Sequence, residues 1–430
     1  MGRHRREVKA GRSWPEARLV LDLCQLVEGT GGMAQTGKPA GTVAEVFWTF
    51  LRLGCTSFGG PIAHLGYFRA ECVDRRGWLS DADYADLVAL CQVLPGPASS
   101  QVGFALGLHR AGPLGALAAF VGFTLPSALV LLGFALGVGS LTGPVAVGAL
   151  HGLKIVAVAV VAQAVLGMAR TLCPDRETAA IAVAAVVALA AFPSGMGMIG
   201  AIGLGALAGL VTGRAGESAP TGRASLSLPR WVGIAASALF ATGLVALPLL
   251  ADRAEVWAVA DAFYRSGALV FGGGHVVLPL LDAAVVQPGW VSDADFLAGY
   301  GAAQAVPGPL FTLSAYLGAV SIAGPGGLAG AALALAAIFL PGFLILIGVL
   351  PFWDRLRQVA PVRRALRGIN AAVVGILGAA LYDPVFTGSV GGMADFALAL
   401  ALFVALTVWK CPPWLAVLAG AAGGIVLALA

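Results

Sequence analysis

Residues Gln92–Ser100 have the sequence QVLPGPASS and interrupt an apolar run that extends from Tyr84 to Leu108. Proline lacks an amide donor and clashes with the preceding helical turn, and glycine loosens the backbone that remains. The same pattern returns as QAVPGPLFT at residues 304–312. The sequence therefore predicts two broken helices, and their meaning depends on the solvent around them.

Composition indicates that this solvent is a lipid bilayer. Of the 430 residues, 59% are hydrophobic and 11% are charged, whereas a soluble domain carries roughly 25% charged residues. Apolar stretches of about 20 residues, long enough to cross a bilayer as a helix, recur along the chain. They are continuous rather than alternating, which argues against a β-barrel. We predict an all-α polytopic membrane protein.

Thirteen membrane spans are expected, and the polar stretch between residues 213 and 230 separates six of them from seven. The predicted spans are residues 45–68, 84–108, 114–139, 145–169, 178–194, 196–213, 231–250, 257–281, 296–321, 325–350, 366–383, 394–409 and 412–430.

The two halves of the chain repeat each other. FGGPIAHL at Phe58 matches FGGGHVVL at Phe271, GWLSDADY at Gly77 matches GWVSDADF at Gly289, and the two Pro-Gly-Pro stretches follow at nearly the same spacing. One span lies between the six-span halves, so the second half enters from the opposite face, as in many secondary transporters. The predicted divisions are a disordered basic tail (1–42), a first transporter repeat (43–213), a linker with a connecting helix (214–256) and a second transporter repeat (257–430).

Lysine and arginine placement orients the chain, because these residues accumulate on the cytoplasmic side. It places the N-terminus inside the cell and the C-terminus outside. Arg69, Arg75 and Arg76 fit least well, since this topology leaves them outside. Whether residues 58–84 form a re-entrant segment therefore stays open.

Matching breaks in two repeats point to a substrate site at the repeat interface. The predicted site includes Gly59, Gly60, Pro61, Pro95, Gly96 and Pro97 in the first half and Gly272, Gly273, Gly274, Pro307, Gly308 and Pro309 in the second. The alternative is a pair of structural kinks with glycines for close helix packing.

The charges inside the predicted spans suggest a negatively charged substrate. Arg52 and Arg265 each lie six residues before a repeated Phe-Gly-Gly. An arginine within the membrane is costly, and its planar donors suit oxyanions. Amides at the ends of broken helices add positive potential. Further predicted donors are Gln92, Ser99, Ser100, Gln304 and Thr312. The alternative is that both arginines extend to the nearest membrane surface.

Several ionisable residues are candidates for coupling transport to an ion gradient. They are His64, His275, Glu71, Asp282 and Lys154. Packed neutral histidines and surface ion pairs are the alternatives for the first four. The SDAD motifs at Ser80 and Ser292 predict helix N-caps. The chain has no metal-binding cysteine pair, nucleophile motif or nucleotide-binding loop in a suitable context. We therefore expect that the protein is not an enzyme and that it has no cofactor and no nucleic-acid partner.

The ordered motifs FGGP, RRGWLS and LPGP, followed by FGGG, GWVS, QAVPGPLF and AYLG, resemble the chromate ion transporter (CHR) family in its long form with two fused halves. The resemblance extends from Val43 to the C-terminus. It implies an inner-membrane carrier that expels chromate and confers chromate resistance. Chromate is a tetrahedral dianion that mimics sulfate, so sulfate is an expected competitor.

Three matters stay open at this point. A carrier for sulfate or another oxyanion, and an anion channel, would use the same arginines and breaks. The coupling ion cannot be read from the residues. A homodimer in the bilayer is one assembly that the sequence allows.

Overall fold

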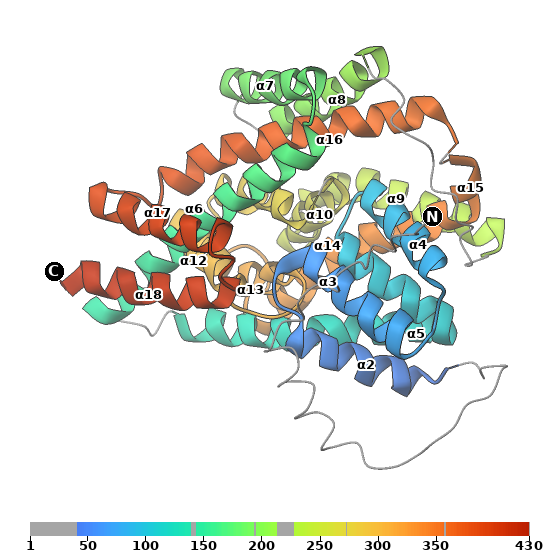
Figure 1. Ribbon diagram of the computed structural model, residues 1–430, viewed down its shortest axis with the longest axis horizontal. Coiled ribbons are helices and arrows are strands. Elements are labelled where there is room, and N and C mark those ends of the chain that lie inside the picture. The colour runs from blue at the N-terminus through green and yellow to red at the C-terminus, as the bar shows by residue number, and fades with distance from the viewer. Residues whose placement is uncertain are drawn as a thin grey trace, which may run out of the picture. The chain divides into compact units, whose positions relative to one another are not determined.

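The computed structural model describes residues 41–138, 143–192, 195–212, 228–271, 273–356 and 358–429 (Figure 1). Every regular element within these ranges is a helix. The predicted disordered tail and most of the predicted linker lie outside the described residues.

The first half contains seven α-helices and one π-helical segment. They are α2 (Val43–Thr56), α3 (Gly60–Phe68) continued by η1 (Arg69–Arg75), α4 (Asp81–Val93), α5 (Ala98–Val138), α6 (Pro144–Leu172), α7 (Arg176–Ala191) and α8 (Gly195–Thr212). Helix α5 is kinked at Ala111 and Gly112, which divides it into a short first segment and a long second segment.

The second half repeats this order after one additional helix, α9 (Arg230–Ala251). Its elements are α10 (Glu255–Ala268), η2 (Gly274–Val276), α11 (Val277–Leu281), η3 (Asp282–Val286), α12 (Asp293–Ala303), η4 (Leu310–Thr312), α13 (Leu313–Val320), α14 (Gly327–Val349), η5 (Leu350–Phe352), α15 (Trp353–Leu356), α16 (Ala360–Ala380), η6 (Leu381–Phe386), α17 (Met393–Thr407) and α18 (Pro413–Leu429). In this order α10 corresponds to α2, α14 to the second segment of α5, and α16 to α6.

Five helices among the described residues are long and apolar enough to cross a membrane. They span Ala98–Gly137, Pro144–Leu172, Arg230–Ala251, Gly327–Leu356 and Ala360–Phe386. Shorter apolar helices follow, such as Met393–Thr407 and Pro413–Leu429. The chain is therefore a helical, multi-pass membrane protein, as its composition predicts.

Four predicted spans are not continuous helices. Residues 45–68, 84–108, 257–281 and 296–321 are each divided into shorter helices at a glycine-containing break. The cause is local. Gly59, Gly96 and Gly308 have φ angles of 99°, 116° and 109°, which the right-handed helix excludes. The flanking prolines also remove amide donors at two of the breaks.

Side-chain contacts show that the first-half breaks reverse the chain. Glu45, at the start of α2, pairs with Arg76 just after η1 (3.4 Å) and with Arg110 near the end of the first segment of α5 (3.0 Å). His109 contacts the carbonyl of Trp78, just before α4, at 3.2 Å. Thus α2 with α3–η1, and α4 with the first segment of α5, form two antiparallel hairpins whose open ends lie together.

The second half contains the same two hairpins. The Ile322 N–H, after α13, donates to the carbonyl of Trp290, before α12 (3.0 Å). The Gly324 N–H donates to Glu255 at the start of α10 (2.9 Å). The open ends of these hairpins therefore also lie together.

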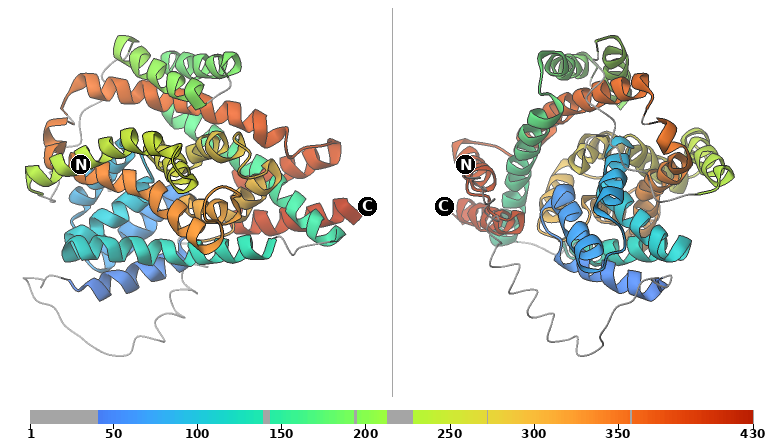
Figure 2. Two further views of the ribbon diagram at one scale, coloured as in Figure 1. Left: turned by 180° about the vertical axis from the view of Figure 1, so that it is seen from behind. Right: turned by 45° about the vertical axis from the view of Figure 1, so that its right-hand side comes forward.

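The last two helices of each half pack on the long helix of the other half (Figures 1 and 2). Helices α17 and α18 contact α6, and α7 and α8 contact α16. A Cβ on Gly152 of α6 would lie 2.1 Å from the Gly420 oxygen, and one on Gly368 of α16 would lie 2.0 Å from the Gly205 oxygen. Only glycine permits helices to approach this closely.

Polar contacts reinforce this exchange of helices. His151 of α6 contacts Asp395 of α17 at 2.9 Å, and Arg367 of α16 pairs with Asp175 at the start of α7. The Thr178 amide and hydroxyl donate to Asp175 and, together with Arg367, hold the pKa of that carboxyl below its ordinary value. Both halves are therefore joined by equivalent pairs of elements.

Candidate functional site

The hairpin tips of the two halves are hydrogen-bonded to each other. The Gly96 N–H donates to the Val270 carbonyl at 2.8 Å, and the Gly308 N–H donates to the Ser57 carbonyl at 3.0 Å. Gly96 and Gly308 are repeat equivalents, and so are Ser57 and Val270. Each Pro-Gly-Pro tip is thus docked on the glycine-rich break of the opposite half. We call this region the tip junction.

Each tip also packs against a proline-containing stretch of a long helix from the other half. A Cβ on Gly96 would lie 2.9 Å from the Cα of Gly342, which follows Pro341 in α14. A Cβ on Gly308 would lie 2.8 Å from Oγ of Ser127, which follows Pro126 in α5. Each tip therefore approaches the opposite helix so closely that a residue larger than glycine at Gly96 or Gly308 would collide with it.

Gln101 holds the first-half Pro-Gly-Pro tip in place. It was not singled out in the sequence analysis. Its side chain is fully buried, and its amide donates to the Pro95 carbonyl (2.9 Å) and the Gly342 carbonyl (2.8 Å). It therefore links its own tip to α14 of the other half. A glutamine directly after a break in an apolar helix was the available signal.

Helices begin at the tip junction on both sides. Helix α3 starts at Gly60 and α5 at Ala98, and the second-half helical segments start at Gly274 and Leu310. The amino end of a helix carries partial positive charge and free amides. The breaks therefore bring electropositive backbone to a buried place between the halves.

A polar cluster surrounds the Ser57 carbonyl. His64 is 1% exposed, its Nε2 lies 3.2 Å from the Ser57 carbonyl oxygen, and its Nδ1 lies 3.4 Å from Ser99 Oγ. A carbonyl only accepts, so Nε2 carries the proton, and in the neutral ring Ser99 donates to Nδ1. Phe123 packs against the imidazole with ring centres 5.2 Å apart.

Three hydroxyls near this cluster lack partners within the part of the chain that the structure describes. They belong to Ser57, Ser100 and Thr124, which are 0%, 3% and 2% exposed. In contrast, the hydroxyl of the predicted donor Thr312 donates to the Pro309 carbonyl (2.7 Å).

The two predicted arginines have different surroundings. Arg52 is partly buried, and its guanidinium forms no hydrogen bond or ion pair with the described residues. Arg265 is exposed and pairs with Asp261, which lies one turn earlier in α10 and is 2% exposed. The repeat equivalent of Asp261 is Trp48, so the ion pair belongs to the second half.

The remaining predicted site residues are spread around the junction. Gly59, Gly60, Pro61, Gly273, Gly274, Pro95, Pro97, Pro307 and Pro309 lie at the breaks, Gln92 is exposed, Gln304 is partly buried, and Gly272 lies outside the described residues. The glycines and prolines therefore form the breaks themselves, and of the two predicted amide donors only Gln304 has a buried Nε2, which lacks a partner among the described residues.

The coupling candidates also differ. Glu71 pairs with Arg75 (3.0 Å) and Arg76 (2.6 Å) at the open end of a hairpin. His275 contacts the Tyr300 hydroxyl at 2.8 Å. Asp282 is buried at the start of η3, and Lys154 is partly buried on α6. The predicted N-caps are confirmed, because Ser80 and Ser292 accept from the amides three residues on.

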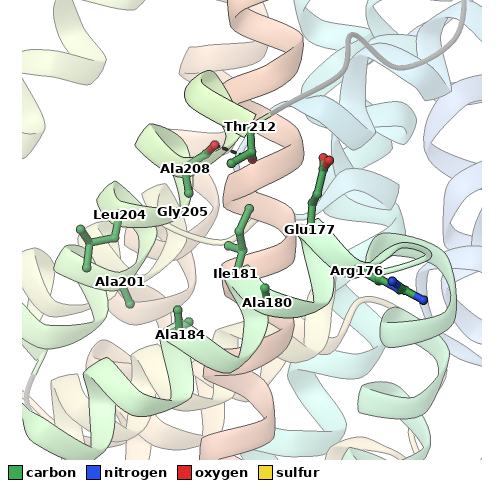
Figure 3. A pocket seen from close by; sticks show the side chains of 11 residues that line it. Arg176, Glu177, Ala180, Ile181, Ala184, Ala201, Leu204, Gly205, Ala208 and Thr212 are labelled. Carbon is green, nitrogen blue, oxygen red and sulfur yellow. Dashed lines mark hydrogen bonds between the residues drawn. The ribbon is translucent and has the colours of Figure 1, made fainter.

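A separate pocket of about 600 Å³ lies between α7 and α8 (Figure 3). Alanines, Ile181 and Leu204 form most of its wall, and Arg176 and Glu177 lie at one end. Its wall offers few donors, so it lacks the chemistry that an oxyanion needs.

Comparison with known proteins assigns the chain to a family. Residues 44–210 and residues 257–425 both match the family model described as chromate transporter. The chain belongs to the chromate transporter family. The two matched regions coincide with the two halves of the fold, so the family match agrees with the internal repeat.

Curated relatives of this family cover most of the chain. A chromate transport protein of Pseudomonas aeruginosa is 30% identical over 89% of this chain and 91% of its own length. A probable chromate transport protein of Synechococcus elongatus is 28% identical over 80% of this chain and 84% of its own length. A chromate transport protein of Cupriavidus metallidurans is 28% identical over 79% of this chain and 82% of its own length. No solved structure matches the chain.

Proposed function

We propose that this protein is a secondary carrier of a tetrahedral oxyanion, with chromate as its substrate, and that it exports chromate across the cell inner membrane and so confers resistance. The observation that carries the proposal is the reciprocal docking of Gly96 on Val270 and of Gly308 on Ser57. It supports a shared site where helix amino ends from both halves meet. Chromate is chosen among oxyanions because relatives carry that name.

The proposed topology has inverted halves but fewer crossings than thirteen. Each hairpin begins and ends on one side, so α2 through the first segment of α5 do not cross. The second segment of α5 and helices α6, α7 and α8 cross four times and return the chain to its starting side. Helix α9 crosses alone, so the second half begins on the opposite side and repeats the pattern. Nine segments cross, and the parity that makes the halves inverted is unchanged.

The charge distribution supports this topology. With re-entrant hairpins, Arg69, Arg75 and Arg76 return to the side of the basic tail. Every lysine and arginine outside the membrane segments then lies on that side, except Arg253. Because positive residues accumulate in the cytoplasm, the N-terminus is inside and the C-terminus outside.

Alternating access follows from the symmetry of the junction. Two inverted copies that dock through equivalent bonds can exchange conformations, so the state open to one side has a counterpart open to the other. Movement of one pair of hairpins against the other would expose the junction to each side in turn.

The test is chromate counterflow in proteoliposomes that contain the purified protein. The expected result is trans-stimulated exchange that sulfate inhibits by competition. Substrate on the far side accelerates flux only in a carrier, because a carrier's binding site reorients faster with substrate bound than without it. Collapse of the proton gradient in inverted vesicles then shows whether protons drive uptake. Chromate flux without trans-stimulation would identify a channel, and exchange of sulfate without chromate would identify another oxyanion carrier.

A further inference from the structure

The two sides of the tip junction have different chemistry at equivalent positions. When the repeated Phe-Gly-Gly, Pro-Gly-Pro and Leu-Pro motifs are aligned, Ser57, His64, Ser99 and Thr124 of the first half correspond to Val270, Val277, Phe311 and Phe339 of the second. The equivalent positions are therefore polar in the first half and apolar in the second.

In the second half, aromatic side chains occupy the equivalent positions of the tip junction. The rings of Phe311 and Phe339 contact each other with centres 5.7 Å apart. The nearby hydroxyls of Thr312 and Ser314 are bonded to carbonyls of their own helical turns, at 2.7 Å and 2.8 Å. The hydroxyls of Thr312 and Ser314 are therefore already satisfied, whereas the Tyr316 hydroxyl and Gln304 Nε2 of this half are buried without a partner among the described residues.

The first half has kept hydroxyls that bind nothing within the described part of the chain. Burial of an unpartnered hydroxyl costs free energy that a bound acceptor recovers. Ser57, Ser100 and Thr124 carry three such groups. Ser57 binds His64 through its carbonyl, and Ser100 and Thr124 directly follow Ser99 and Phe123, which contact the same imidazole. Helices α3 and α5 begin beside them, and their amino ends add positive potential.

We propose that the oxyanion binds on the first-half side of the tip junction, with the hydroxyls of Ser57, Ser100 and Thr124 as its donors. His64 is a positioning residue that holds the Ser57 backbone and orients Ser99. The second half supplies the apolar wall of Phe311 and Phe339. This inference rests on the proposed function and makes the substrate site one-sided.

The test compares Ser57→Ala and Thr124→Val with the control Ser314→Ala. Loss of one hydrogen bond to an anion should weaken apparent chromate affinity about tenfold or more. The control removes a buried hydroxyl that is already bonded within its own half, so its affinity should stay at the wild-type value. Thr124→Ser should retain binding, because it keeps the hydroxyl.

Two readouts separate binding from folding. Chromate-dependent stabilisation of the purified protein reports affinity, and the melting temperature without chromate reports folding. If wild-type protein exchanges chromate and the hydroxyl variants bind it normally, the one-sided site is wrong and the carrier stands. If wild-type protein neither binds nor exchanges an oxyanion, the proposed function itself fails. If exchange by the wild-type protein needs a cation such as sodium, and the hydroxyl variants lose only that requirement with unchanged chromate affinity, the hydroxyls belong to the cation and the inference is overturned.

Discussion

Arg52 and Arg265 occupy equivalent residues of the repeat but face different partners. Arg265 neutralises Asp261, whose side chain is 3% exposed, whereas Arg52 is available to a ligand. The same residue type therefore has two roles. We propose that the charge of Arg52 serves substrate binding and that the charge of Arg265 serves the stability of α10.

We expect Arg52→Gln to weaken chromate affinity by about tenfold or more with an unchanged melting temperature. Arg265→Gln should instead destabilise the protein, by roughly 2 kcal/mol, because it leaves a buried carboxylate without its counter-charge. Adding Asp261→Asn to Arg265→Gln should restore the melting temperature. Weaker chromate binding by Arg265→Gln at normal stability would instead place Arg265 in the site.

Part of this difference was visible in the sequence. Asp261 lies four residues before Arg265, a spacing at which side chains on a helix meet, and Trp48 replaces it in the first half. Of the three free hydroxyls, only that of Ser100 was among the donors predicted from the sequence; those of Ser57 and Thr124 were not. A serine or threonine in an apolar helix usually bonds to its own backbone, as Thr312 does, and the sequence does not distinguish Thr124 from it.

At the scale of elements, the tips depend on glycine for both conformation and space. Gly308 combines a φ of 109° with a neighbour 2.8 Å from its missing Cβ, and Gly96 combines a φ of 116° with a neighbour at 2.9 Å. Alanine at either position strains the backbone and also pushes the two halves apart.

Gly308→Ala and Gly96→Ala should therefore abolish chromate exchange, with insertion into the membrane retained. Gly112→Ala is the matched control, because Gly112 has a φ of 67° but no atom within 4 Å of its missing Cβ. The control should lose about 1–2 kcal/mol of stability and keep transport. Exchange assays normalised to protein level measure this, and normal exchange by Gly308→Ala would show that close docking of the tips is not needed.

The breaks themselves were predictable, because Pro-Gly-Pro cannot continue a helix. The reversal of the chain was signalled only at the first break, where Arg69, Arg75 and Arg76 fit an outside loop least well. An apolar segment of about 25 residues has the same hydropathy whether it crosses the bilayer once or enters and returns. Only contacts distant in sequence, such as Glu45 with Arg76 and Arg110, decide between these forms.

For the whole molecule, the re-entrant hairpins make a prediction about sidedness. In a cysteine-free background, single cysteines at Asp74 and Asp354 should be labelled from the cytoplasm, and one at Asp252 from outside. All three positions are exposed. With thirteen crossings, Asp74 and Asp252 would share the outer side, so labelling of both from outside would contradict the hairpins.

The number of halves and their order could be predicted because the Phe-Gly-Gly, Gly-Trp and Pro-Gly-Pro motifs recur at nearly constant spacing. The exchange of helices between halves could not, because small residues on α6, α8, α16 and α18 do not specify which partner they meet. The contacts of Gly152 with Gly420 and of Gly368 with Gly205 form only in the assembled fold.

This exchange has a consequence for synthesis. Gly209 of α8 contacts Gly368 of α16, and at typical translation rates the intervening chain of about 160 residues takes roughly 10 to 30 seconds to make. During that time α7 and α8 are in the bilayer with their glycine faces covered only by lipid. The first half is thus exposed to membrane quality control until the second half arrives, which favours keeping both halves on one polypeptide.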